Sequence, residues 1–412
     1  MDFDERCYLS DPYRTVFTAR VRRIEPAGEG LAAVYLEATC FYPESGGQPD
    51  DRGTLDGNPV IGVAEDERGV RHLVRGEPHE GAEVEGCVDW GRRFDHMQQH
   101  TGQHLLSRVL LEFHKLRTVS FHLGEETCTI DLEGAAPSQE TLDAAEARAN
   151  DLVFKNIPLL CRIVGADELA ELPGPESDSP VLRSRLPDGI DRVRIVEIAD
   201  VDSSTCCGTH VRATGEIGII KILGMEKVKG NARVAFICGG RAVRDYAAKH
   251  ALLGAVAAGF STGWRDVPGV LAKLNEEHRE LRKRSDELGR ELAGWRAAEL
   301  SRPTSAAGGF DIVRRVFTAG DAGSLRETAT KIREMGKKIV LFGLSGPSPA
   351  LLFACSAEVP LNMGDILKAC AATIGARGGG TKDFAQGGGG DGSRIEEALE
   401  AAERMIHERL GA

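Results

Sequence analysis

The sequence lacks any apolar stretch long enough to cross a membrane. Its longest apolar run, Ala251–Phe260, covers about half of the roughly 20 residues that a membrane-spanning helix requires. The N-terminal stretch MDFDERCYLSDPYRT is acidic and lacks the basic and then apolar segments of a secretory signal. We therefore expect no membrane partner, and the sequence predicts a cytoplasmic protein.

Paired cysteine spacing, which is typical of disulfide frameworks, is also missing. Ten cysteines are scattered through 412 residues, and Cys206 and Cys207 are the adjacent pair. Adjacent cysteines do not readily bridge each other, and scattered cysteines of an intracellular chain are usually reduced. A functional role for any of them must therefore come from its neighbours.

Basic residues are outnumbered, and the formal net charge of −12 argues against general nucleic-acid binding. A local exception lies between residues 221 and 249, where basic residues outnumber Glu226 and Asp245. A basic patch on an acidic body can hold phosphates, although a solvated charged face explains the pattern equally well. The basic residues are Lys221, Lys227, Lys229, Arg233, Arg241, Arg244 and Lys249.

The remaining composition, 42% apolar and 28% charged in 412 residues, is that of a globular chain with two or three domains. Residues 15–90 alternate apolar and polar positions, as in Thr15–Ile24 and Leu31–Leu36, and predict a small β-barrel or sandwich. At Asp95 the spacing of the apolar residues changes from that of a strand to that of a helix. Asp95 and Gln98 have capping-box spacing and predict a helix from there to about His114. Mixed strand and helix signals, including a helix at residues 139–155, continue to about residue 240 and indicate an α+β domain.

A heptad seam follows and predicts a coiled-coil-like helix or helical hairpin. The seam either joins two subunits or packs within one chain, and we favour a homodimer. Its residues are Val267, Leu271, Leu274, His278, Leu281, Ser285, Leu288, Leu292 and Trp295.

The last hundred or so residues predict a compact α/β domain, preceded by a linker at residues 302–309. We expect strands at residues 310–317, 338–344 and 351–357, a helix at residues 364–374, and then a glycine-dense loop. Ser393 and Glu396 have capping-box spacing and predict the start of the final amphipathic helix, whose apolar face is Ile395, Leu399, Ala402, Ile406 and Leu410.

Two short segments carry metal-binding residue types. His100 and His104 lie four residues apart on the predicted helix, so both imidazoles can reach one ion. Cys206 and His210 repeat the same interval with a thiolate and an imidazole. Nitrogen and sulfur ligands of this kind suit Zn²⁺, and the sequence therefore predicts one zinc ion per chain.

Several alternatives stay open at this stage. Four protein ligands would make a structural zinc site, whereas a catalytic zinc keeps one position for water or substrate, with His210 outside the ligand set. His96 could extend the row of ligands, and Cys207 could replace Cys206. A zinc-protease site is excluded, because Thr101 stands where that motif requires a glutamate.

A third segment, FYPESGGQPDDRG, combines tight turns with a polar side chain. Gly46 and Gly47 let the backbone turn sharply and approach a ligand closely. Gln48 could then direct its amide toward a carbonyl or a sugar hydroxyl. A plain hairpin turn is the alternative interpretation.

At these three segments the chain resembles the stand-alone alanyl-tRNA editing proteins of the AlaX type, long form. The matching stretches are FYPESGGQPDDRG, RRFDHMQQHTGQHLLS, CCGTHVRATGEIGIIKI and EKVKGNARVAFICGGRAV, within residues 12–245. The stretch NMGDILKACAATIGARGGGTKDFAQGG is similar to the DHH-associated domain that ends alanyl-tRNA synthetases. One position departs from the family pattern Cys-Gly-Gly-Thr-His, since Cys207 replaces the first glycine.

The resemblance implies an α+β fold with four parts. These are a β-barrel-like domain with the glycine-rich loop (residues 1–90), a zinc-containing editing domain as in threonyl and alanyl-tRNA synthetases (91–245), a helical coiled-coil segment (246–302) and a DHH-associated α/β domain (303–412). It also implies zinc ligands at His100, His104, Cys206 and His210. It further implies a substrate-facing Thr101 and a glycine-rich loop at Gly46–Gln48 near the terminal adenosine, and it suggests tRNA contacts and dimerisation from the C-terminal region. We expect catalytic roles for Thr101 and Gln48, and substrate or tRNA contacts at Gly46, Gly47, Lys227, Lys229 and Arg233.

The implied activity is hydrolysis of tRNA(Ala) mischarged with serine or glycine, with zinc polarising the amino-acid end beside a positioned water. The editing-like region begins almost at residue 1, so we expect no adenylate-forming domain and no aminoacylation. A non-catalytic, zinc-stabilised tRNA-binding module is the alternative. A phosphoesterase, suggested by the DHH-associated ending, is a second alternative, but such enzymes need an Asp-His-His core and the sequence contains no such tripeptide.

Overall fold

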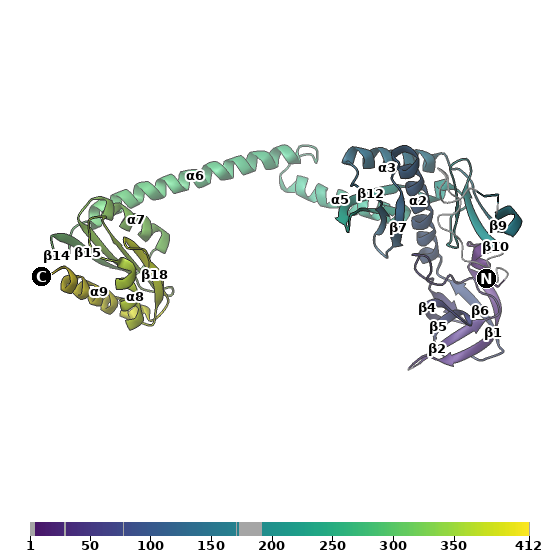
Figure 1. Cartoon of the computed structure of the whole chain (residues 1–412), viewed down its shortest axis with the longest axis horizontal. Coiled ribbons are helices and arrows are strands. Elements are labelled where there is room, and N and C mark those ends of the chain that lie inside the picture. Colours follow the sequence, from purple (N-terminus) through teal and green to yellow (C-terminus); the bar gives the residue numbers. More distant parts are fainter. Residues whose placement is uncertain (1–4, 29, 77, 170, 173–191, 412) are drawn as a thin grey trace. The chain divides into compact units, whose positions relative to one another are not determined.

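The structure is a computed structural model that describes residues 5–411 except 29, 77, 170 and 173–191. The chain divides into two compact units, Met1–Ala255 and Val256–Ala412, which we describe separately (Figure 1). Among the described residues, no helix is both long and apolar enough to span a bilayer.

The N-terminal unit begins with a short helix, α1 (Cys7–Ser10), and a closed β-barrel. The strands pair in the order β1-β2-β5-β4-β3-β6. The predicted alternation holds in β1, whose inward residues Phe17, Ala19 and Val21 are buried in the barrel core. Of the two all-β arrangements predicted, the barrel is therefore confirmed. Its strands are β1 (Val16–Pro26), β2 (Leu31–Leu36), β3 (Gly53–Leu55), β4 (Asn58–Asp66), β5 (Gly69–Arg75) and β6 (Glu83–Val88).

The long helix α2 (Trp90–His114) follows the barrel directly. The predicted start at Asp95 is wrong, because Asp89 is the N-cap and its side chain accepts a hydrogen bond from the Arg92 amide. Asp95 has another partner, since its carboxylate binds the Arg241 guanidinium at 2.6 Å. The predicted end at His114 is confirmed.

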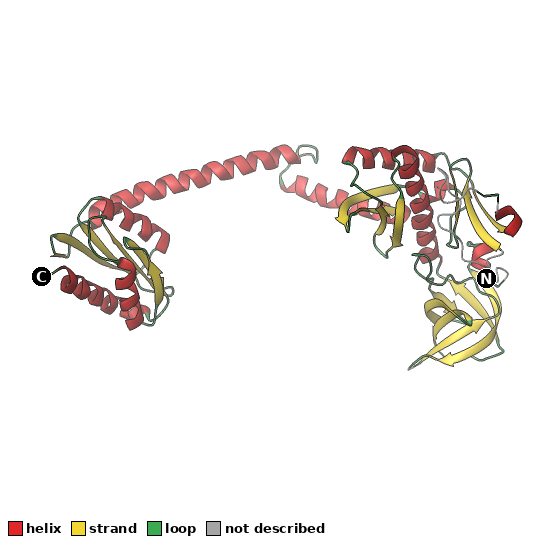
Figure 2. Ribbon diagram, viewed as in Figure 1, coloured by secondary structure: helices red, strands yellow, loops and turns green. Residues whose placement is uncertain are grey.

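Helix α2 packs among α3, η1 and a four-stranded sheet of order β12-β13-β8-β7, and a three-stranded sheet of order β11-β10-β9 completes the α+β region (Figure 2). Buried apolar residues of α2, α3 and the four-stranded sheet form one core. The elements are β7 (Thr118–Leu123), β8 (Cys128–Leu132), α3 (Gln139–Phe154), β9 (Leu159–Gly165), α4 (Ala166–Leu169), β10 (Arg192–Ile198), β11 (Asp202–Thr205), η1 (Thr214–Ile217), β12 (Ile220–Val228), β13 (Asn231–Cys238) and α5 (Gly239–Gly259).

A buried ion pair fastens the glycine-rich loop of the barrel to α2. Arg93 and Asp51 are both fully buried. The Arg93 Nε donates to Asp51 Oδ1 at 3.1 Å, and its Nη1 donates to the Pro12 carbonyl at 2.6 Å. Asp51 also accepts from the Tyr42 amide at 2.6 Å. The pair therefore fixes the loop that carries Gln48 at a set position along α2.

The C-terminal unit holds the long helix α6 (Val267–Leu300) and an α/β domain around a six-stranded sheet of order β14-β15-β16-β17-β19-β18. Alternate residues of the central strands face opposite sides. Ile339 and Leu341 pack with α8 and α9, whereas Val340 and Phe342 pack with α7. The elements are β14 (Ser305–Ala307), β15 (Phe310–Phe317), α7 (Ala322–Glu334), β16 (Lys338–Leu344), β17 (Ala350–Cys355), α8 (Met363–Thr373), β18 (Arg377–Gly380), β19 (Phe384–Gly388), η2 (Gly392–Arg394) and α9 (Ile395–Leu410).

Three expectations for this unit are wrong. The expected linker at residues 302–309 contains β14, which pairs with β15 at the sheet edge. The glycine-dense segment is a hairpin rather than a loop, because its strands approach so closely that a Cβ on Gly378 would lie 2.4 Å from the Gly387 Cα. Ser393 does not cap the last helix. Asp391 caps a 3-10 turn there and accepts from the Ser393 amide at 3.0 Å.

Replacing Asp51 with alanine should destabilise the N-terminal unit by about 3–5 kcal/mol, because it leaves the buried Arg93 charge without its partner. Trp90 is the tryptophan of this unit, and its fluorescence in a urea titration reports the unfolding of the unit.

The matched control is Lys249→Ala, which removes an exposed pair with Asp245 and should cost less than about 1 kcal/mol. Equal losses in the two variants would contradict the role given to the buried pair.

A candidate metal centre

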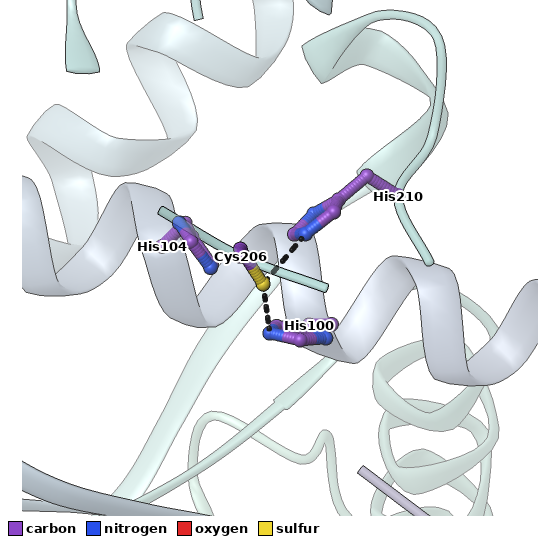
Figure 3. Close-up of side chains that lie close together, drawn as sticks. All are labelled: His100, His104, Cys206 and His210. Carbon is purple, nitrogen blue, oxygen red and sulfur yellow. Dashed lines mark hydrogen bonds between the residues drawn. The ribbon is translucent and has the colours of Figure 1, made fainter. Parts of the chain in front are cut away.

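Four side chains from two distant segments meet at one point (Figure 3). The ligand atoms of His100, His104, Cys206 and His210 all lie within 4.8 Å of one another. The Cys206 Sγ is 3.4 Å from the His100 Nε2 and 3.3 Å from the His210 Nε2. Two of the residues come from α2 and two from the chain after β11. The structure therefore brings together all four ligands that the sequence analysis named.

Hydrogen bonds on the outer side of each ring orient the three imidazoles. The Gln48 Oε1 lies 2.7 Å from the His100 Nδ1. The Ser204 Oγ lies 2.9 Å from the His104 Nδ1, and the Thr101 Oγ1 lies 3.1 Å from the His210 Nδ1. A partner on Nδ1 fixes the tautomer in which Nε2 carries the lone pair that binds a metal.

The Ser204 contact continues to a carboxylate. The Ser204 hydroxyl donates to Asp202 Oδ2 at 3.3 Å, and that oxygen lies 3.7 Å from the His104 Nδ1. Because the Ser204 hydroxyl donates its hydrogen to Asp202, the Ser204 oxygen can accept a hydrogen bond from the His104 Nδ1–H. A histidine backed by a hydroxyl and a carboxylate is a common arrangement behind a bound metal.

The loop that carries Cys206 and His210 is held by Arg194, which is 1% exposed. Its Nη1 donates to the carbonyls of Cys206 and Gly208 at 2.8 and 2.9 Å. Gly208 is required sterically, since a Cβ there would lie 2.1 Å from the His100 Cε1. Arg194, Asp202 and Ser204 were not predicted from the sequence. An arginine inside the apolar strand at residues 193–198 was the signal that could have pointed to a buried anchoring role.

The Cys206 thiol has an unusual electrostatic environment. Burial raises its pKa, but the His104 ring, the Gly208 amide and the Arg194 charge together outweigh burial, so the pKa lies below the ordinary value for cysteine. Thiolates, not thiols, bind metals. The cluster therefore fits a metal ion that prefers three imidazole nitrogens and one thiolate.

Neither alternative ligand belongs to the cluster. Among the described residues, the group that could hold an ion excludes His96 and Cys207. The Cys207 side chain lines a small surface pocket with Tyr8 and Tyr42, on the barrel side of the loop. The departure from the family pattern at Cys207 therefore leaves the four ligand positions intact.

Gln48 and Thr101 lie differently from the substrate-facing positions expected for them. Both side chains are fully buried. The Gln48 Nε2 donates to the Thr209 hydroxyl at 2.8 Å, while its Oε1 contacts His100 and accepts from the Thr209 amide at 3.1 Å. The Thr101 hydroxyl accepts from the Val211 amide at 3.2 Å. Each side chain is thus engaged in holding a ring of the cluster.

The glycine-rich loop runs beside this cluster. Gly46 and Gly47 are exposed and have φ of 54° and 83°, in the left-handed region that favours glycine. Gly47 also lies against Phe121, since a Cβ there would come within 3.1 Å of that ring. The expected sharp turn is therefore present next to His100, whose ring centroid is 5.6 Å from that of Phe121.

The basic residues between 221 and 249 are less available than their number suggests. Four of them form ion pairs with carboxylates: Lys221 with Glu146, Arg233 with Asp131, Arg241 with Asp95, and Lys249 with Asp245. Lys227, near the end of β12, and Lys229, in the turn before β13, are exposed, and neither pairs with an acidic residue in the described part of the chain.

Comparison with family models identifies two domains. Residues 193–235 match the threonyl and alanyl tRNA synthetase second additional domain, and residues 312–408 match the DHHA1 domain. The first match includes Cys206 and His210, and the second covers the α/β domain of the C-terminal unit. The chain is therefore of the class that joins the additional domain of these synthetases to a DHHA1 domain.

Similarity to curated proteins identifies the family within this class. The chain is 31% identical to the alanyl-tRNA editing protein AlaX-L of Pyrococcus horikoshii, over 93% of this chain and 94% of the relative. It is 34% identical to the alanyl-tRNA editing protein Aarsd1 of Rattus norvegicus, over 77% and 78%. It is also 32% identical to the alanine–tRNA ligase of Natronomonas pharaonis, over 99% of this chain but 44% of that protein. The chain belongs to the family of alanyl-tRNA editing proteins that includes AlaX-L.

Replacing Gln48 with leucine should weaken metal affinity by about 10–100-fold while all four ligands remain, because His100 loses the partner that orients its ring. Competition with a chromophoric chelator measures this affinity.

Gln139→Leu, at an exposed position that begins α3, is the control and should leave the affinity unchanged. A Gln48→Leu protein that binds metal as tightly as the unmodified protein would show that the Gln48–His100 contact does not organise the site.

Proposed function

We propose that this chain is a trans-editing hydrolase that deacylates tRNA(Ala) mischarged with serine, and also with glycine, in the cytoplasm. One zinc ion per chain would be held by His100, His104, Cys206 and His210. The observation that carries the proposal is the convergence of these four side chains in a chain whose relatives are named for alanyl-tRNA editing. Three nitrogens and a thiolate are a ligand set that zinc prefers.

When bound, the ion supplies a Lewis acid that can polarise the aminoacyl ester or anchor the amino-acid end. The chain's own residues orient the site. Gln48, Ser204 and Thr101 hold the three rings, and Arg194 holds the loop between Cys206 and Gly208. The exposed Gly46–Gly47 turn beside His100 leaves room for the terminal adenosine to approach the backbone.

The body of the tRNA needs cationic contacts away from the cluster. Lys227 and Lys229 are suited to this because they are exposed and not neutralised by a described carboxylate. Arg233 is a weaker candidate, since Asp131 already binds it at 2.7 and 2.9 Å. Two exposed lysines on one β-hairpin give a local phosphate-binding point on a chain of net charge −12.

One observation favours a second candidate, a non-catalytic zinc-stabilised tRNA-binding module. With four protein ligands in reach of one point, zinc could have a closed tetrahedral shell, as in structural sites. Such a module would bind tRNA(Ala) but leave its ester intact, so turnover distinguishes the two candidates.

Deacylation of seryl-, glycyl- and alanyl-tRNA(Ala) tests the proposal. The native protein should release serine and glycine while sparing alanine, and His104→Ala should slow both releases by about 100-fold or more and lose its zinc. His114→Ala, at the end of the same helix, is the control. Native protein that carries zinc but releases no amino acid would favour the non-catalytic module.

Thr101 offers a test of how serine is distinguished. Its buried hydroxyl faces His210 and the Val211 amide, so we expect it to act as a positioning residue. Thr101→Val should therefore lower metal affinity and slow the seryl and glycyl reactions together, by about tenfold. A fall confined to the seryl substrate would instead assign Thr101 to recognition of the serine hydroxyl.

We further propose that α6 joins two chains as a coiled coil. From Leu271 to Trp295 its seam is exposed in the described chain, with Leu281 70% and Trp295 78% exposed, whereas Val267 is buried. An exposed apolar stripe over about four heptads is typical of a helix that packs against a second helix.

Leu281→Asp and Leu288→Asp together should convert a dimer to a monomer, because each charge would be buried between two helices. Light scattering after size-exclusion chromatography measures the mass. Glu280→Ala and Glu287→Ala, beside the seam, should leave the dimer intact, and a native protein that runs as a monomer contradicts the proposal.

A further inference from the structure

One buried histidine lacks the protein partner that its counterparts have. In the described part of the chain, His72, His100, His104 and His210 each have a partner on Nδ1, whereas the Nδ1 of His96 has none. His96 is only 2% exposed. A buried polar atom without a partner disfavours folding, so such an atom calls for a specific explanation.

The ring of His96 is neutral at physiological pH. Burial, and after it the neighbouring charge of Arg92, lower its pKa to about 3. A neutral imidazole has one N–H donor and one acceptor nitrogen. The unpartnered Nδ1 therefore either donates or accepts one hydrogen bond, depending on the tautomer, and a hydroxyl group can be its partner in both cases.

The position of His96 is next to the candidate metal centre. It lies one helical turn before His100 on α2, at which spacing two side chains share a face with Cβ atoms about 5–6 Å apart. The same stretch of α2 binds the glycine-rich loop, since the Arg92 Nε donates to the Asp50 carbonyl at 2.8 Å. His96 thus lies on α2 between Arg92 and His100, both of which contact the glycine-rich loop.

The charges around His96 are balanced. Arg92 lies 3.5 Å from both Asp50 and Glu125. Arg241, whose charge also acts on His96, pairs with Asp95 at 2.6 Å. With each arginine matched by a carboxylate, the surroundings do not favour an added phosphate. A neutral hydroxyl fits them better.

We infer that His96 binds the ribose hydroxyl adjacent to the ester on the terminal nucleotide of the tRNA, and so positions that ribose beside His100. The inference rests on the proposed function, in which the esterified ribose comes to the metal centre. His96 is then a binding residue for the substrate's sugar and not an additional metal ligand, in keeping with its exclusion from the cluster.

The test uses uncharged RNA minihelices that end in CCA, with a terminal adenosine, 2′-deoxyadenosine or 3′-deoxyadenosine. His96→Phe should weaken binding of the unmodified RNA by about three- to tenfold, the effect of one hydrogen bond. For one of the two deoxy RNAs, His96→Phe should weaken binding by less than about twofold, because that RNA already lacks the hydroxyl that His96 binds.

Two further variants separate binding from structure. His96→Asn, whose amide can replace the Nδ1 contact, should restore most of the affinity, and His114→Phe at the other end of α2 should have no effect. If His96→Phe does not fold, His96→Ala takes its place. Equal losses of affinity with all three RNAs would overturn the inference. An unchanged affinity for all three RNAs would also overturn it, because His96 would then bind only an ordered water.

Deacylation of the seryl minihelix by the same proteins separates this inference from the proposed function. Native protein that deacylates while His96→Phe shows unchanged binding and rate defeats the inference alone. Native protein that binds the RNA but releases no serine defeats the proposed function, and a deoxy-sensitive loss in His96→Phe would still place the ribose at His96.

Discussion

The candidate metal centre depends on hydrogen bonds to the outer nitrogen of three imidazole rings. Gln48, Ser204 and Thr101 contact the Nδ1 atoms of the three histidines. Without these contacts each ring could rotate or change tautomer, and four ligand atoms would not stay within 4.8 Å of one another. The orienting residues come from the barrel loop, from β11 and from α2 itself, so the site needs the whole N-terminal unit.

Because the site needs residues from both the barrel and the editing-type domain, these two parts must be held in a fixed relative position. The fully buried Arg93–Asp51 ion pair fixes the position of the glycine-rich loop along the axis of α2. Gln48 lies in that loop and contacts His100 and Thr209. On the opposite side Arg194 anchors the loop of Cys206 and Gly208. Two buried arginines thus position the two halves of one site, at a desolvation cost that only well-formed partners can offset.

Much of this arrangement could be predicted from the sequence. The alternation in residues 15–90 indicated a barrel or a sandwich, and the four-residue intervals of His100–His104 and Cys206–His210 indicated a metal site, because period and spacing are local properties. The full set of four ligands came from the resemblance to the family. The helix start was missed because Asp89 and Asp95 are both good caps, and only the tertiary partner Arg241 shows that Asp95 has another role. The roles of Gln48, Thr101 and His96 depend on contacts between distant segments, which no local pattern contains.

In the site that we propose, three imidazoles and one thiolate share a single ion. X-ray absorption at the zinc edge of the purified protein tests it most directly, because the spectrum counts sulfur and nitrogen neighbours separately at their different distances from zinc. We expect one sulfur and three nitrogens around one zinc per chain. A shell with two sulfurs, which would bring in Cys207, or a shell with none would contradict it.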